Sequence, residues 1–233
     1  MKTLLPLRPT LLTCRILPHA DSAILRGVGA EPARHTSLGF VTCDQDDSLY
    51  AALDHATKFA PVDVVYATSF YAGSRHASGP LSGECMGVLA GADPDEVAEG
   101  LSALRAALET DICFYAQASE DGRTPRGPAF FPHVIPRLGR YLAAQAALAP
   151  GDGLAYLIAP PVEAMLGLDA AVKAADVRMV RFFGPPTETN FAGAYLTGAL
   201  PDLDAAAHAF TLAVLDVAES PLREARRPGH ERR

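Results

Sequence analysis

Residues 54–65 read DHATKFAPVDVV, and residues 169–180 read DAAVKAADVRMV. Asp, Ala, Lys, Ala and Val recur in step between these stretches at an offset of 115 residues. A second pair, LAGADPD at 89–95 and LTGALPD at 196–202, recurs at an offset of 107. Because self-similarity indicates a repeated architecture, we infer an internal duplication. The offsets differ by eight, so the first copy has eight extra residues between its two segments, within 67–82.

Each copy is predicted to contain the same series of strands and helices. Short apolar runs favour strands, apolar residues at helical spacing favour helices, and Pro94 and Pro201 can open a helix. The first copy should have strands at 8–17, 38–41, 63–66 and 83–89 and helices at 48–59 and 95–108. The second should have strands at 133–138, 154–158, 177–180 and 192–196 and helices at 162–174 and 203–218. This series predicts an α/β fold of two sandwiches, in which helices cover a sheet.

The segment 114–128 between the copies is polar and rich in turn-forming residues, which predicts a domain boundary. We expect a first domain at 1–114 and a second domain at 115–222. The remaining residues, 223–233, should form a basic, disordered tail, because their arginines are interrupted by Pro and Gly.

The composition restricts the class of protein. The chain has 233 residues, of which 49% are hydrophobic, so it can bury a substantial core. A net charge of −7 argues against nucleic acid as a partner, since phosphate binding needs a basic face. No apolar run approaches the roughly 20 residues of a membrane span, and Pro6, Arg8 and Pro9 interrupt any signal peptide. Four dispersed cysteines are typical of reduced thiols, so we expect a cytosolic protein without membrane contact.

Several short segments, read in order along the chain, carry a family resemblance. They include SLG at 37–39, ATK at 56–58, YAG at 71–73, APP at 159–161 and ETN at 188–190. Together with LDAAVKAADV at 168–177, they resemble the shell domains of bacterial microcompartments. In each half a strand comes first, and the segment that matches this signature follows later in the chain. This order resembles the tandem, circularly permuted class of shell domain in ethanolamine-utilisation compartments.

The resemblance implies a structural role and no catalysis. It implies two permuted, ferredoxin-like microcompartment domains in each chain, and a homotrimer that mimics a hexagon. Such pseudohexamers would pack with other shell proteins into a flat sheet that forms the compartment shell. No cofactor would be required.

The resemblance also implies a small pore in each subunit that binds or passes a polar metabolite such as ethanolamine. Matched to the family, the pore-binding residues are Asp46, Asp47, Glu84, Phe114, Thr189, Asn190 and Phe191. The family has Tyr where Phe191 stands, so one hydroxyl is missing here. By position alone, Asp46 and Asp47 would also suit a helix start, where carboxylates favour the dipole and can cap.

The eight extra residues lie within ATSFYAGSRHASGPLS at 67–82, whose Gly, Ser and Pro content favours a mobile loop. The resemblance implies that three such loops gate a central pore, wide enough when open for a large cofactor such as cobalamin. The residues of this gating loop would be Phe70, Tyr71, Ala72, Gly73, Ser74, Arg75 and His76. The alternative is an idle surface loop, since insertions there cost little.

Two other functions are compatible with the residues. One is a small-molecule sensor with paired ferredoxin-like domains, which would bind a ligand without forming sheets. The other is an enzyme that uses Asp46, Asp47 and Glu84 as acid, base or metal ligands. Against the enzyme, no nucleophile elbow, P-loop or dinucleotide fingerprint is present. No histidines have ligand spacing, so no metal site is predicted.

Overall fold

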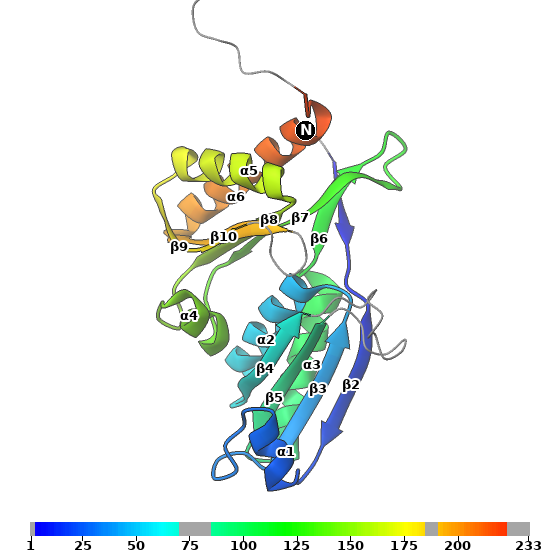
Figure 1. Ribbon diagram of the computed structural model, residues 1–233, viewed down its shortest axis with the longest axis vertical. Helices are drawn as coiled ribbons and strands as arrows, with labels where there is room; N and C mark the ends of the chain where they lie inside the picture. Colours follow the sequence, from blue (N-terminus) through cyan, green and yellow to red (C-terminus); the bar gives the residue numbers. More distant parts are fainter. Residues whose placement is uncertain (1–2, 70–84, 185–190, 223–233) are drawn as a thin grey trace, which may run out of the picture.

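The computed structural model describes residues 3–69, 85–184 and 191–222. Within them, each half of the chain contains a sheet covered by helices, and the halves lie one above the other along the long axis (Figure 1). The first sheet is antiparallel, in the order β2-β3-β5-β4. Its strands are β2 (Leu11–Leu17), β3 (Ser37–Cys43), β4 (Asp63–Ser69) and β5 (Cys85–Gly91), with helices α1 (Ser22–Gly27), α2 (Asp46–Phe59) and α3 (Pro94–Thr110).

The second sheet repeats this order and extends it by two strands. The order β7-β8-β10-β9 is the counterpart of β2-β3-β5-β4, and β6 and β1 continue the sheet beyond β7. The strands are β1 (Leu4–Leu7), β6 (Phe114–Ala118), β7 (Pro125–Ile135), β8 (Leu154–Ala159), β9 (Val177–Phe183) and β10 (Ala192–Gly198). The helices are α4 (Arg140–Ala146), α5 (Pro161–Ala174) and α6 (Leu200–Glu219). The predicted duplication and mixed α/β class are therefore confirmed.

Two strand pairings differ from what the local composition suggests. The segment 114–128, expected to be a turn-rich linker, instead forms the hairpin of β6 and β7, in which Ala118 lies opposite Pro125. Strand β1 comes from the predicted first domain, yet Leu7 pairs with Phe114 in the second sheet. The turn-forming residues mark the tip of this hairpin, and local composition cannot report that β1 pairs with a strand more than a hundred residues away. The boundary between 114 and 115 stays a prediction, and the tail at 223–233 lies outside the described residues.

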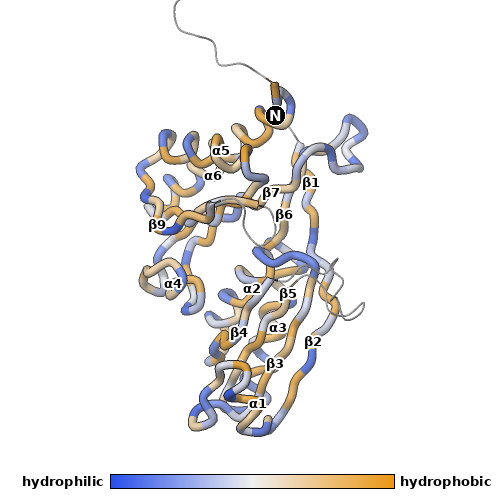
Figure 2. Tube along the Cα trace, in the orientation of Figure 1, coloured by the Kyte–Doolittle hydropathy of each residue, from blue (hydrophilic) through white to orange (hydrophobic). Residues whose placement is uncertain are grey.

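Alternation along the strands separates two cores on the two faces of the second sheet. Ala155 and Leu157 face α5 and α6, where they pack with Leu168 and Phe210. Tyr156 faces the other way and packs with residues of α2 and α4. Figure 2 shows that hydrophobic residues (orange) recur along the strands of both sheets. Because successive side chains of a strand point to opposite faces, the second sheet is buried on both.

Helix α2 joins the two halves. Its Asp54 side chain is fully buried and accepts hydrogen bonds from the backbone N–H of Gly139 (2.7 Å) and of Leu142 (2.9 Å). Thr57 Oγ1 accepts from the backbone N–H of Arg140 at 3.0 Å. These bonds satisfy N–H groups that the start of α4 cannot pair within its own helix. A Cβ at Gly139 would lie 2.4 Å from the Asp54 carbonyl oxygen, so the approach requires glycine.

Candidate functional site

The predicted carboxylates lie where the N-terminus of α2 meets the second half of the chain. Asp46 and Asp47 occupy the first turn of α2, where the helix dipole favours negative charge. The cap residue itself is Gln45, which makes no side-chain capping bond. Its amide instead donates to the Leu7 carbonyl at 2.8 Å. The prediction of a helix start was therefore correct, but neither aspartate is the cap residue.

Asp47 is covered by the second sheet. The Tyr156 hydroxyl donates a hydrogen bond to Asp47 Oδ1. The Tyr156 ring also packs edge-on against Tyr195, with centroids 4.5 Å apart, and against Phe131 at 5.3 Å. Aromatic pairs favour this arrangement because the positive edge of one ring faces the negative face of the other. Asp47 is thus held in place by a buried aromatic cluster from β7, β8 and β10.

Both carboxylates are in surroundings that disfavour their charge. Burial raises the pKa of Asp46, although hydrogen bonds from the Asp47 backbone and from Ser69 partly oppose this. Burial, and then repulsion from Asp46, raise the pKa of Asp47 well above its usual range. Within the described residues, neither carboxylate forms an ion pair. Among the residues that the structure describes, the pair therefore has no positive partner.

Ser69 at the end of β4 adds a polar group that the sequence did not single out. Its hydroxyl is buried and, among the described residues, meets no partner with full hydrogen-bond geometry. It still lies near enough to Asp46 to favour the ionised carboxylate. Ser69 follows an apolar strand in the sequence, and that position alone gives no signal of a binding role.

The predicted aromatic residues also lie together. Phe114 and Phe191 pack edge-on with ring centroids 5.8 Å apart, and Phe114 packs against Phe131 at 5.1 Å. Phe131 in turn contacts Tyr156, so the aromatic cluster connects these rings to Asp47. Of the seven predicted pore residues, Asp46, Asp47, Phe114 and Phe191 can be placed. Glu84, Thr189, Asn190 and the predicted gating loop at Phe70–His76 lie outside the described residues.

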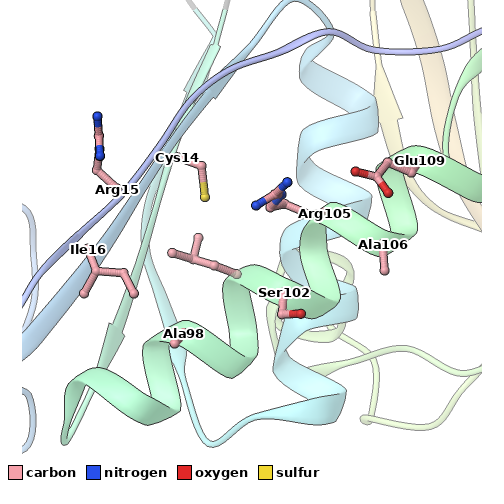
Figure 3. A pocket seen from close by; sticks show the side chains of 9 residues that line it. Cys14, Arg15, Ile16, Ala98, Ser102, Arg105, Ala106 and Glu109 are labelled. Atoms are coloured by element: carbon pink, nitrogen blue, oxygen red, sulfur yellow. The ribbon is translucent and has the colours of Figure 1, made fainter.

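Two cavities lie away from these residues. The larger, of about 600 Å³, is an open groove between β2 and α3 (Figure 3), where Arg15 and Arg105 lie beside Cys14. Burial raises the pKa of the Cys14 thiol, although the two arginines partly oppose this. The second, of about 400 Å³, is lined by His55, His133 and other residues, and burial lowers the pKa of His133 to about 4. Neither contains a predicted pore residue.

Two kinds of feature are absent from residues 3–69, 85–184 and 191–222. No three His, Cys, Asp or Glu side chains there are grouped to hold a metal ion. None of the helices described is long and apolar enough to span a membrane.

Comparison with known proteins shows the family. The family model described as BMC domain matches residues 37–118. The bacterial microcompartment shell protein EutL of Clostridium perfringens is 47% identical over 216 residues, which cover 93% of this chain and 97% of that protein. The EutL protein of Salmonella typhimurium is 43% identical over 219 residues, covering 94% and 97%.

Solved structures give the same result. The crystal structure of EutL from Clostridium perfringens has a TM-score of 0.86 at 47% identity, covering 95% of this chain and 98% of that one. The trimeric microcompartment shell protein PduB has a TM-score of 0.70 at 16% identity, over 91% of this chain and 89% of that one. At that identity, the second likeness concerns the fold alone.

Proposed function

Because the chain belongs to the EutL family of bacterial microcompartment shell proteins, we propose that it forms a homotrimeric shell tile with a ligand site in each subunit and a gated central pore. It is a structural component of the shell of an ethanolamine-utilisation compartment rather than an enzyme. The homotrimer, the ligand site and the gated pore are our proposals, whereas the shell role follows from the family.

The observation that carries the ligand site is a pair of adjacent carboxylates with no positive partner among the described residues. Asp47 contacts a buried aromatic cluster through Tyr156, and the Ser69 hydroxyl lies close to Asp46. A small molecule with an ammonium group and a hydroxyl would match both features. At about 4 Å, one charge pair is worth roughly 4 kcal/mol at an effective dielectric near 20. We therefore propose protonated ethanolamine as the ligand, bound or passed through a small pore.

The duplication supports the proposed trimer. Two similar halves in each of three chains would give six near-equal sides, which suits packing with other shell proteins in a sheet. We further propose that loop 70–76 gates the central pore and that a large cofactor such as cobalamin passes through it. This last proposal rests on the family resemblance, and no cofactor is proposed to reside in the protein.

Ligand binding can be tested by titration calorimetry with ethanolamine at pH 7. Asp46→Asn should weaken binding at least tenfold, because about 1.4 kcal/mol of charge attraction is enough for that factor. Ser69→Ala should weaken binding as well, since a hydroxyl partner is lost. The matched control is Ser102→Ala, which removes a serine hydroxyl from the separate groove of Figure 3 and should leave affinity unchanged.

Ethanol, which has the hydroxyl but no charge, should bind much more weakly than ethanolamine. If wild type and Asp46→Asn bound ethanolamine equally well, the carboxylate pair would not be the site.

A further inference from the structure

Asp46 and Asp47 are adjacent in the chain, yet their carboxylates have different hydrogen-bond donors. Asp46 Oδ1 accepts from the backbone N–H of Asp47 at 2.9 Å, in the first turn of α2. Among the described residues, the Asp47 carboxylate accepts from the Tyr156 hydroxyl and from no backbone N–H. Because hydrogen bonds to a carboxylate favour its ionised form, the first position holds a negative charge better than the second.

The titratable groups that face Asp47 within the described residues are a second acid and three phenols. Asp46 and Tyr50 lie on α2 itself, whereas Tyr156 comes from β8 and Tyr195 from β10. Burial raises the pKa of all three phenols, so they stay neutral at physiological pH. Asp47 is 6% exposed, so water can do little to stabilise its charge.

One basic side chain approaches this cluster but binds other groups. The positive charge of Arg181 on β9 reaches the Tyr195 hydroxyl. Its guanidinium donates to Gln145 Oε1 at 2.8 Å and lies 5.0 Å from the centroid of the Phe183 ring. Across the described ranges it forms no ion pair with either aspartate. The two acids therefore share their surroundings without a fixed base.

These surroundings act differently on the two acids. Burial, and then repulsion from Asp46, raise the pKa of Asp47 well above its usual range. Burial raises the pKa of Asp46 too, but backbone hydrogen bonds and the Ser69 hydroxyl oppose the effect there. When the environments of two neighbouring carboxyl groups differ in this way, one can be charged while the other stays neutral.

We propose that Asp47 carries a proton in the ligand-free protein and releases it when an organic ammonium ion binds beside the charged Asp46. The inference rests on the ligand site proposed above. It adds the separate roles of the two carboxyl groups and a dependence of affinity on pH. Asp46 is the permanent anchor for the cation, and Asp47 supplies a second negative charge only when a cation is present.

The exchange is balanced in charge. Before binding, the pair carries one negative charge, on Asp46. On binding, the O–H bond of the Asp47 carboxyl group breaks, its electron pair stays on the carboxylate, and the proton passes to the solvent. Two carboxylates and one ammonium group again carry one negative charge in total. The buried cluster thus never holds two negative charges without a cation, which would be costly.

The second half of the chain lacks this pair. At the offset of 115 residues, the counterparts of Asp46 and Asp47 are Pro161 and Val162, neither of which titrates. The duplication therefore does not double the acid pair, and we expect one ligand and at most one proton for each chain.

The first test counts protons during titration calorimetry with ethanolamine at pH 6. Phosphate and ACES buffers have different heats of ionisation, so a released proton makes the measured heat differ between them. Wild type should release at least about half a proton for each ligand bound. Asp47→Asn, which keeps Asp46, should bind ethanolamine and release less than about a tenth of a proton.

The second test follows affinity with pH. Wild-type affinity should rise about fivefold to tenfold from pH 5 to pH 6, because binding is linked to the loss of one proton. In Asp47→Asn the rise should be about twofold or less. Tyr156→Phe removes a hydroxyl that favours ionised Asp47, so its affinity should keep rising to a higher pH than in wild type. The control Asp204→Asn, at an exposed position of α6, should behave as wild type.

The outcomes separate this inference from the ligand site on which it rests. Equal heats of binding in the two buffers, or undiminished proton release by Asp47→Asn, would overturn the role of Asp47 and leave the ligand site standing. A wild-type protein that binds no ethanolamine at any pH between 5 and 8 would overturn the ligand site itself.

Discussion

At the residue scale, the duplication gives one position two different roles. Asp47 and Val162 are equivalent in the repeat, yet Asp47 is buried against Tyr156 and Val162 is exposed. A buried carboxylate without a positive partner destabilises the fold when it is ionised. Asp47 therefore costs stability at any pH where it is ionised.

The pH dependence of stability should report this carboxylate. Burial raises the pKa of Asp47 in the native state, so the native state holds the proton to higher pH than the unfolded chain does. Stability should then fall as pH rises from the ordinary pKa of about 4 through the raised pKa. In Asp47→Asn, the side-chain carbonyl can still accept from Tyr156 but never ionises. The difference in unfolding free energy between pH 5 and pH 8 should become smaller, as measured by urea denaturation at fixed protein concentration.

Asp204→Asn serves as the control, because Asp204 is exposed on α6. It should keep the wild-type difference between the two pH values. The prediction would be wrong if Asp47→Asn kept that difference too.

At the element scale, the start of α4 depends on a side chain from another helix. Gly139 begins α4 without a side-chain cap of its own, and Asp54 of α2 accepts from its N–H instead. The same carboxylate accepts from the Leu142 N–H and lies 3.4 Å from Lys58 Nζ. The two halves are thus joined by capping as well as by apolar packing.

Removing this carboxylate should be costly. Asp54→Ala leaves two buried N–H groups without an acceptor, so the free energy of unfolding should fall by about 2–4 kcal/mol. Glu99→Ala, at an exposed position of α3, should change it by no more than about 0.5 kcal/mol. Urea denaturation of both variants measures the difference. A loss below about 1 kcal/mol for Asp54→Ala would show that apolar packing alone holds α4.

At the scale of the whole molecule, the shell role requires flat assembly, which also separates it from the sensor alternative. Concentrated protein should form hexagonally packed sheets in electron micrographs, whereas a sensor should form none.

Deleting residues 73–79 should leave these sheets intact and raise the permeability of assembled shells, if the loop gates the central pore. Equal leakage from shells with and without the deletion would show that it does not.

The sequence by itself determined the duplication, most strands and helices, and the family. These follow from local information: hydrophobic period, helix-opening prolines and short segments such as 54–65 and 169–180. It also placed Asp46 and Asp47 at a helix start. Only the tertiary structure decided that β1 joins the second sheet, that Tyr156 covers Asp47, and that Asp54 caps α4. Each of these contacts joins residues that are 85 or more positions apart, and no local pattern of composition or periodicity specifies such a partner.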